Sequence, residues 1–421
     1  MMDFLTLPEG PVTLRNLTLP AGIVDGQTAS CAHTLHIREG KISATPGQPV
    51  DMRGAMVVPA FVDMHTHLDK GHIWPRAANP DGSFAEALRT AGADREAFWS
   101  AQDVAARMDF ALRCAYAHGT RAIRTHLDSI PPQDAISWPV FADMRARWKG
   151  RIDLQAACLV GCDAVTAEGP YSRTADLVAR TGGILGMVAY PVPDLADRIS
   201  LVLKLAADRN LEVDFHVDET LDPTSEALRL VAQTVLDMDF DKRVVVGHLC
   251  SLAAQDADRA AQTMDMVARA GLNVVSLPLC NLYLQDRQVG TPRLRGITLV
   301  HELKARGVNV SFASDNTRDP FYAYGDLDMI EVMREATRIG HLDHADADWL
   351  RAFTVNPARA CGFDVPDLSP GSPADLVICR AREWTEFFAR PQTDRIVLRA
   401  GRQIDRTLPD YAELDHLMRS T

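Results

Sequence analysis

Two histidines, His65 and His67, stand two residues apart at the end of the apolar run 57–66. Successive side chains of a β-strand point to opposite faces, so residues two apart project from the same face. Two imidazoles placed in this way can bind one metal ion, although a surface His-x-His pair also arises by chance. The pair therefore suggests a metal-dependent enzyme, provided that other parts of the chain supply further ligands.

Three later β-rich runs end in residues of the same chemical kind. One ends at His216 and continues into Glu219, the second ends at His248, and the third ends at Asp315. In a barrel of parallel strands, the carboxyl ends of all strands meet on one face, where active sites of that architecture are built. The sequence thus predicts that these side chains share one site with the histidine pair.

The order of these motifs resembles the amidohydrolase superfamily and, within it, the cytosine deaminase-like branch. The resemblance covers nearly the whole chain and rests on FVDMHTHLDK, RTHLD, HVDE, GHLCS and SDNTRDPF, in this order between residues 61 and 321. The stretch 281–316 is especially similar to cytosine deaminases. The chain is also similar to aminotriazine hydrolases of the N-isopropylammelide amidohydrolase type. The resemblance implies a (β/α)8 barrel that uses a metal ion to hydrolyse a C–N bond.

The resemblance also implies a set of four metal ligands. They are His65, His67, His216 and Asp315. Nitrogen and oxygen donors of this kind suit Zn(II) or Fe(II). Relatives that bind two metals carry a carboxylated lysine on the fourth barrel strand, whereas the run 183–190 contains no Lys, Glu or Cys. We therefore predict one divalent metal ion per chain.

The same resemblance implies catalytic roles for three residues. Glu219 would protonate a ring nitrogen of the substrate, which makes the adjacent carbon more electrophilic. Asp315 would accept a proton from the metal-activated water and deliver it to the departing ammonia. His248 would orient that water and stabilise charge in the tetrahedral intermediate. The nucleophile in this scheme is water and not a side chain.

Five further positions are expected to contact the substrate. Cytosine deaminases carry a Gln that pairs with the pyrimidine edge where this chain has Gly161, an Asp in place of Asn316, and a Trp in place of Phe321. Lys70 stands where they usually have Thr and where aminotriazine hydrolases have Lys. Trp74 would cap the substrate from the loop after the first strand. Losing a buried polar partner weakens discrimination strongly, so these differences argue against cytosine itself.

Several polar residues near the site admit a second interpretation. His126 and Asp128 would either hold a metal-binding histidine or form a polar network that only supports the barrel. Lys70 is also compatible with a solvated loop lysine. Trp74, in the loop 70–82, is compatible with packing beneath that loop. The sequence leaves these alternatives open.

Eight strand-like runs separated by helical stretches must position these residues. The runs are 57–66, 121–127, 152–160, 183–190, 211–217, 243–248, 272–277 and 307–314. This alternation predicts a (β/α)8 barrel over residues 57–365. Strand signals also occur in residues 1–56 and 366–421. By resemblance, both chain ends pair into one small β-sandwich beside the barrel.

The composition is that of a soluble enzyme. Of the 421 residues, 47% are hydrophobic and 24% are charged, and the formal net charge of −12 argues against a nucleic-acid partner. The chain shows no signal-peptide pattern and no apolar run of about 18 residues, so neither export nor membrane insertion is expected, and we predict a cytoplasmic location. Eight scattered cysteines fit reduced thiols. A homo-oligomer is compatible with the sequence.

The predicted function is hydrolytic deamination of an amino-substituted nitrogen heterocycle, cytosine-like, purine-like or an aminotriazine, with release of ammonia or an amine. Hydrolysis of a cyclic amide by the same superfamily is the alternative, and two metal ions per chain would favour it. A barrel that serves only as a binding or scaffold protein is a remote third, because such barrels have lost the ligands that this chain retains.

Overall fold

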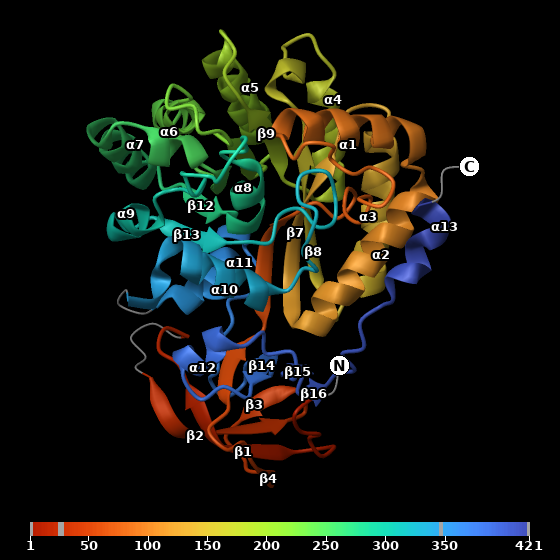
Figure 1. Cartoon of the computed structure of the whole chain (residues 1–421), viewed down its shortest axis with the longest axis vertical. Coiled ribbons are helices and arrows are strands. Elements are labelled where there is room, and N and C mark those ends of the chain that lie inside the picture. The colour runs from red at the N-terminus through yellow and green to blue at the C-terminus, as the bar shows by residue number, and fades with distance from the viewer. Residues whose placement is uncertain (1–2, 24–28, 345–347, 419–421) are drawn as a thin grey trace.

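An α/β arrangement of parallel strands and helices forms the larger part of the molecule (Figure 1). The computed structural model describes residues 3–23, 29–344 and 348–418. One parallel sheet contains β6 (Phe61–Thr66), β7 (Thr120–Asp128) and β8 (Asp153–Leu159). A second contains β9 (Leu185–Ala189), β10 (Val213–Val217), β11 (Val244–His248), β12 (Asn273–Ser276) and β13 (Asn309–Phe312).

The two parallel sheets join at both edges and enclose a common interior. Between β8 and β9, the backbone N–H of Val188 donates to the carbonyl of Val160 at 2.8 Å. At the other edge, the N–H of Asp315 donates to the carbonyl of His65 at 2.9 Å. The resulting ring of eight parallel strands agrees with the predicted barrel.

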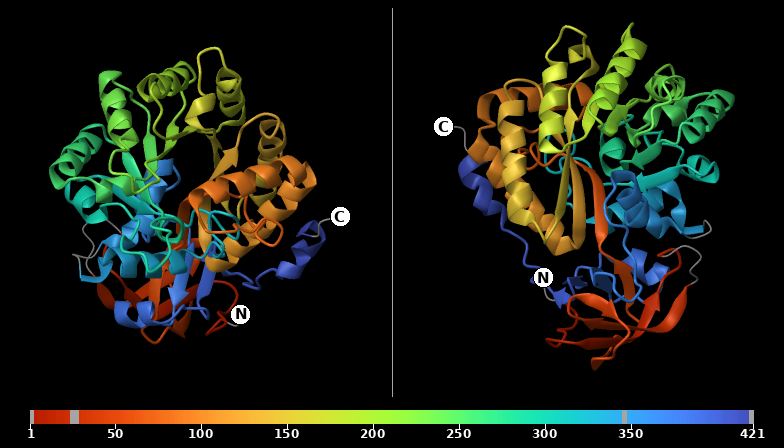
Figure 2. Two further views of the ribbon diagram at one scale, coloured as in Figure 1. Left: turned by 45° about the horizontal axis from the view of Figure 1, so that its top comes forward. Right: turned by 180° about the vertical axis from the view of Figure 1, so that it is seen from behind.

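Helices connect successive strands and cover the outside of the ring (Figure 2). They are α1 (Phe84–Phe98), α2 (Ala101–His118), α3 (Asp134–Trp148), α4 (Tyr171–Thr181), α5 (Leu195–Asp208), α6 (Ala227–Asp237), α7 (Ala257–Arg269), α8 (Pro278–Leu284), α9 (Val300–Ala305), α10 (Met329–Gly340) and α11 (Val355–Cys361). Short 3₁₀ turns are η1 (Cys162–Ala164), η2 (Cys250–Ala254), η3 (Leu342–His344), η4 (Trp349–Phe353) and η5 (Tyr411–Leu414). None of the helices in the described part of the chain is long and apolar enough to cross a bilayer.

Alternation along the strands separates the helix-facing core from the interior of the ring. In β9, Leu185 and Met187 are fully buried in the main apolar core, as are Ile199 and Val202 on α5. The residues between them on β9 face the interior instead, because successive strand side chains point to opposite sides. The apolar layer therefore packs the strands against the outer helices and leaves the inner face of the ring to the alternate residues of each strand.

Both chain ends contribute strands to an eight-stranded sheet below the ring in Figure 1. Its members are β1 (Val12–Leu19), β2 (Ser30–Arg38), β3 (Lys41–Ser43), β4 (Gln48–Asp51), β5 (Met56–Pro59), β14 (Leu376–Cys379), β15 (Ile396–Arg399) and β16 (Arg402–Gln403). The two ends meet where β5 pairs antiparallel with β14. Two short helices, α12 (Trp384–Ala389) and α13 (Asp415–Met418), complete the C-terminal part. The sandwich arrangement and the boundaries at residues 56 and 365 stay predictions.

One predicted strand is in fact two. The run 57–66 divides at Ala60 into β5, which belongs to the terminal sheet, and β6, which belongs to the ring. The N–H of Ala60 donates to the carbonyl of Asp375 at 2.9 Å, so the chain leaves the terminal sheet at this residue. The run is almost wholly apolar, and such a run carries no periodic signal that would reveal the division.

The eight cysteines are unpaired, and all except Cys31 are buried. This agrees with the predicted reduced thiols.

Candidate active site

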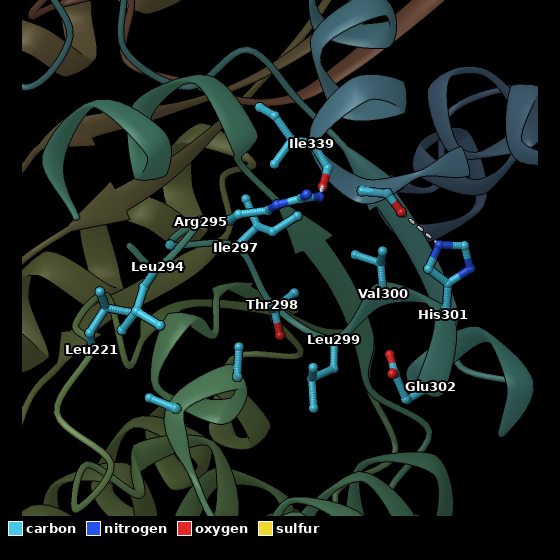
Figure 3. Close-up of a pocket in the computed structure, with 14 residues that line it drawn as sticks. Leu221, Leu294, Arg295, Ile297, Thr298, Leu299, Val300, His301, Glu302 and Ile339 are labelled. Carbon is cyan, nitrogen blue, oxygen red and sulfur yellow. Dashed lines mark hydrogen bonds between the residues drawn. The ribbon is translucent and has the colours of Figure 1, made fainter. Parts of the chain in front are cut away.

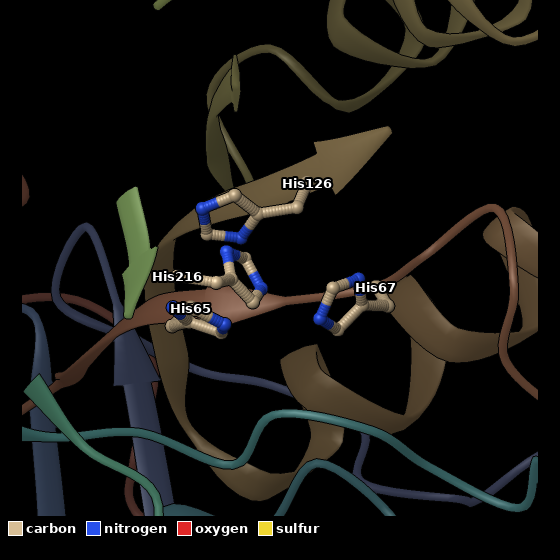
Figure 4. A group of neighbouring side chains, drawn as sticks. All are labelled: His65, His67, His126 and His216. Atoms are coloured by element: carbon tan, nitrogen blue, oxygen red, sulfur yellow. The ribbon is translucent and has the colours of Figure 1, made fainter. Parts of the chain in front are cut away.

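Four histidines converge inside the ring near the carboxyl ends of the strands (Figure 4). His65 and His67 come from β6, His126 from β7 and His216 from β10. One ring nitrogen of each lies within 4.8 Å of a ring nitrogen of every other. The structure therefore brings together three of the predicted metal ligands and adds His126 to them.

Asp315 and His248 complete this group from positions next to the histidine-bearing strands β6 and β10. A carboxylate oxygen of Asp315 lies 3.1 Å from Nε2 of His67 and 3.7 Å from Nε2 of His65. His65, His248 and Asp315 also offer atoms that lie within 4.8 Å of one another. His248 and Asp315 have φ values of 76° and 64°, which non-glycine residues rarely adopt and which occur preferentially at functional sites. The backbone turns sharply where these two side chains enter the site.

Many polar atoms of this group are buried without a hydrogen-bond partner. They include both ring nitrogens of His65 and His216, both carboxylate oxygens of Asp315 and Nε2 of His248. Buried polar atoms in proteins are nearly always paired, so such a concentration of unpaired ones indicates a missing partner. A divalent ion with nitrogen and oxygen ligands fits these atoms.

Burial also sets the protonation state of the histidines. It lowers the pKa of His65, His67 and His216 well below the ordinary value of 6.5, and the crowding of the imidazoles, together with Lys70 for His67 and His216, lowers it further. These imidazoles are therefore neutral at physiological pH. The neutral ring is the form that binds metal ions.

Glu219 and His248 lie beside each other at the mouth of the ring. Oε1 of Glu219 is 3.4 Å from Nδ1 of His248, and the side-chain amide of Asn281 donates to the same nitrogen at 3.0 Å. Burial, and then the nearby charge of Asp315, raises the pKa of Glu219 well above its ordinary value, whereas burial lowers the pKa of His248 to about 4. Burial thus favours the protonated form of the Glu219 carboxyl and the neutral form of His248, whose proton lies on Nε2 because Nδ1 accepts from Asn281.

Sequence reasoning missed Asn281 as a functional residue. The only signal was its place at the start of the stretch 281–316, whose similarity to cytosine deaminases is strongest. Its contact with His248 joins residues 33 positions apart, and only the fold brings them together.

His126 links the histidine cluster to a polar network below it. Its Nε2 lies 3.2 Å from a carboxylate oxygen of Asp214, and the other oxygen accepts a hydrogen bond from Arg124 at 3.0 Å. The centroid of its ring is 4.1 Å from that of His65. His126 therefore touches a predicted ligand and belongs to the barrel network, and which of the two predicted roles it has stays open. Asp214 was missed, although it lies two residues before His216 and so shares its strand face.

Comparison with known proteins places the chain in a family. Residues 169–405 match the amidohydrolase family. A pterin deaminase from Rhizobium rhizogenes strain K84 is 50% identical over 429 residues, which cover 98% of each chain. The chain belongs to the amidohydrolase family. This confirms the family predicted from the motifs.

More distant relatives of this amidohydrolase include both branches that the motifs resemble. The N-isopropylammelide isopropyl amidohydrolase of Pseudomonas sp. strain ADP is 22% identical over 81% of this chain and 83% of its own. The 5-methylcytosine deaminase of Klebsiella pneumoniae, solved with 5-fluorocytosine, superimposes with a TM-score of 0.79 at 23% identity, covering 95% of this chain and 98% of that one. The N-isopropylammelide isopropylaminohydrolase of Burkholderia multivorans gives a TM-score of 0.73 at 24% identity, covering 94% and 98%. At these identities the structural likeness shows the shared fold.

Lys70 of the amidohydrolase is buried beside the histidine cluster. Its ammonium lies 3.2 Å from a carboxylate oxygen of Asp128 and 5.0 Å from the centroid of the Phe321 ring, and only 5% of the residue is exposed. Burial opposes its charge, but the carboxylates of Asp128 and Asp69 more than offset this and raise its pKa. The alternative of a solvated loop lysine is therefore wrong.

Asn316 and Trp74 are held by contacts that secure the loop after β13. The amide of Asn316 donates to Asp319 at 2.7 Å, and the residue is 4% exposed. Trp74 is half-buried, and its backbone N–H donates to the carbonyl of Arg318 at 2.8 Å. Direct contact of either side chain with a substrate stays a prediction.

The side chains of Asp163 and Tyr190 fill the space next to Gly161. A Cβ atom on this glycine would lie 2.5 Å from a carboxylate oxygen of Asp163 and 2.9 Å from the hydroxyl of Tyr190. The Tyr190 hydroxyl donates to Asp163. Sequence reasoning recognised the absence of a side chain at Gly161 but not the pair that occupies its place.

Arg76 fixes the long loop after β6. Its guanidinium donates to Asp94 at 2.9 Å, to Asp103 at 2.6 Å and to the carbonyl of Leu417 at 3.0 Å. This arginine thus joins the loop to α1, α2 and the C-terminal helix α13.

A separate cavity of about 290 Å³ lies beside the loop 294–302 (Figure 3). Its wall is largely apolar and includes Leu221, Ile297 and Leu299. His301, which also lines it, donates a hydrogen bond from Nε2 to the carbonyl of Gly340 at 2.7 Å. The predicted catalytic and metal-binding residues do not line it. The chemistry therefore belongs to the histidine cluster.

Proposed function

We propose that this amidohydrolase is a metal-dependent pterin deaminase. The observation that carries the proposal is the 50% identity to a pterin deaminase over 98% of both chains. The reaction class, hydrolytic deamination of an amino-substituted nitrogen heterocycle, is the one predicted from the sequence. Pterin has such an amino group on C2, so water would replace that group to give 2,4-dioxopteridine and ammonia.

His65, His67, His216 and Asp315 would hold one divalent ion, Zn(II) or Fe(II). Their buried and unpaired nitrogen and oxygen atoms support this assignment. Bound there, the ion would lower the pKa of a water molecule from about 15.7 towards about 7 and so supply hydroxide at neutral pH. The absence of Lys from β9 supports a single ion and weighs against the cyclic amide alternative.

The carboxyl group of Glu219 would donate a proton to a ring nitrogen next to C2. Its raised pKa supports this role, because burial favours the protonated carboxyl group that a proton donor needs. Asp315 would take a proton from the attacking water and pass it to the leaving amine. His248, held by Asn281, would direct its Nε2–H at the charge that develops on the oxygen.

Lys70 would donate a hydrogen bond to the C4 oxygen of the pterin. Its burial between Asp128 and the ring of Phe321 supports this role, because the ammonium is fixed at the edge of the site. Phe321 would provide an apolar wall for the heterocycle. Asn316 and Trp74 would complete the surroundings of the substrate from the loops after β13 and β6.

Ammonia release by metal-analysed protein tests the proposal. The substrates would be pterin, isocytosine, cytosine, 5-methylcytosine and aminotriazines, with free amine measured in parallel. We expect the highest kcat/KM with a pterin, about one metal ion per chain, and loss of turnover when a chelator removes it. Metal-loaded protein that releases no ammonia from pterins would overturn the proposal. Two bound ions together with turnover of a cyclic amide would favour the alternative.

A further inference from the structure

The helix α8 ends beside both Glu219 and His248. We propose that Gln285, at the end of this helix, is a positioning residue that holds Glu219 in place for proton transfer. It would do for Glu219 what Asn281 does for His248. The inference rests on the proposed role of Glu219 as the proton donor and names the group that places it.

Glu219 lies in a stretch of chain without regular structure. The strand β10 ends at Val217, and the next helix, α6, begins at Ala227. The carboxylate of Asp218 accepts hydrogen bonds from the backbone N–H groups of Ala227 and Leu228, at 2.9 Å each. This anchor fixes the chain one residue before Glu219 and leaves the Glu219 carboxyl group to be placed by other contacts.

Gln285 supplies the one hydrogen bond to the main chain of Glu219 among the residues that the structure describes. Its side-chain amide donates to the Glu219 carbonyl at 3.2 Å, and the residue is 9% exposed. A carbonyl oxygen only accepts hydrogen bonds, so the NH₂ end of the amide must face it. The bond ties the loop after β10 to the end of α8.

Gln285 and Asn281 are one helical turn apart and therefore project from the same side of α8. The backbone N–H of Gln285 donates to the carbonyl of Asn281 at 2.9 Å, which closes this turn. The Asn281 amide donates to Nδ1 of His248 at 3.0 Å, and Oε1 of Glu219 lies 3.4 Å from the same nitrogen. One turn of helix thus holds both Glu219 and His248.

Packing on two sides keeps this turn in place. Leu284 of α8 lies in a buried apolar cluster with Ala87 and Ala91 of α1. On another side, the loop after α8 comes so close that a Cβ atom on Gly296 would lie 2.6 Å from Cβ of Gln285. A support that is itself locked by packing can hold a catalytic group within about 0.5 Å of its working position.

The bond from Gln285 should matter more for the rate than for the stability of the protein. A single neutral hydrogen bond contributes little to the stability of a domain of this size. Misplacement of a reacting group by about 1 Å, in contrast, can lower a rate by about 10²-fold. Loss of the amide should therefore leave the fold intact and displace the proton donor.

Gln285→Met tests this, because it removes the amide and nearly preserves the shape of the side chain. On metal-loaded protein with pterin, we expect kcat to fall roughly tenfold, while KM stays within about twofold and the metal content does not change. Gln285→Asn, whose amide is one methylene shorter, should show the same loss. Gln255→Met is the matched control and should keep wild-type kcat, because the Gln255 amide donates in the same way to the carbonyl of Ser225, at 2.9 Å, further along the loop after β10.

Combination with Glu219→Gln separates a positioning role from a structural one. Because Gln285 acts through Glu219, Gln285→Met should cause no further loss in the Glu219→Gln background. A further tenfold loss in that background, an equal loss in Gln255→Met, or an unchanged kcat in Gln285→Met would overturn the inference. Wild-type turnover by Glu219→Gln would instead overturn the proposed role of Glu219, and metal-loaded wild-type protein that releases no ammonia from pterin would overturn the proposed function.

Discussion

The interior of the ring contains two polar layers that are equally buried but differently satisfied. In the lower layer, Arg124 donates to Asp214 at 3.0 Å and to Gln155 at 3.0 Å. In the upper layer, the ring nitrogens of His65 and His216 have no hydrogen-bond partner. His65, Arg124 and Asp214 are each 0% exposed, so burial alone does not distinguish the layers.

The difference between the layers separates a structural role from a ligand-binding role. In the lower layer, Arg124 satisfies Gln155 and one carboxylate oxygen of Asp214, and such pairing is what a buried network needs in order to be stable. Groups in the upper layer are buried without partners, which costs folding free energy that the rest of the fold must offset. In native proteins such groups generally bind a ligand or an ion. Substitutions in the upper layer should therefore reduce metal binding and activity, whereas substitutions in the lower layer should reduce stability.

The largest effect is expected from removing an upper-layer ligand. His216→Ala should abolish both bound metal and ammonia release, because it removes one nitrogen ligand. The protein should stay folded, because the His216 ring makes no hydrogen bond to the rest of the chain. Metal analysis, the activity assay and circular dichroism check this together. His301→Ala, in the separate cavity, is the control and should keep both metal and activity. Full metal content in His216→Ala would contradict the ligand assignment.

A smaller loss is expected when the metal stays but the proton donor is removed. Glu219→Gln should keep the metal and lower kcat by about 10²- to 10⁴-fold, the usual range for general acid–base catalysis. Single-turnover and steady-state rates on metal-loaded protein measure it. Glu226→Gln changes a carboxylate that is paired with Arg229 instead, and should be nearly silent. Wild-type turnover by Glu219→Gln would refute the proposed role.

Substitution of a lower-layer residue should lower the free energy of unfolding. Arg124→Met leaves the carboxylate of Asp214 buried without its arginine, which typically costs about 3–5 kcal/mol in the free energy of unfolding. Urea denaturation measures the change. Arg89→Met removes an arginine whose side chain is 65% exposed, and should cost at most about 1 kcal/mol. Equal costs for the two variants would show that the buried layer is no more important than a surface ion pair.

The smallest effect is expected from a substitution that crowds the His65 ring of the upper layer and removes no polar group. A Cβ atom on Gly247 would lie 3.1 Å and 3.2 Å from two atoms of the His65 ring. Gly247→Ala should shift this ring slightly and weaken metal binding by roughly tenfold, as changes next to metal ligands often do. Competition with a chelator measures the affinity. Gly92→Ala, where a Cβ meets nothing within 4 Å, should leave it unchanged.

The barrel strands and most of the upper layer could be predicted from the sequence because their signals lie within single short segments. Apolar runs with a polar residue at the end locate β10, β11 and β13 within two residues, and the spacing of His65 and His67 is a property of one strand. Partners from distant segments could not be read in this way. Asp214 and Asn281 were missed because their roles depend on contacts with His126 and His248 from other strands.

The sequence by itself determined the family, the reaction class and which residue types stand at the strand ends, because these depend on motifs and on two-residue alternation. Only the tertiary structure decided which buried polar atoms are paired, that Lys70 is buried against Asp128, and that Tyr190 and Asp163 cover Gly161. Each of these outcomes joins segments that are distant in the chain. Burial and pairing arise only when the ring closes, since no local pattern specifies which strand becomes the neighbour of which.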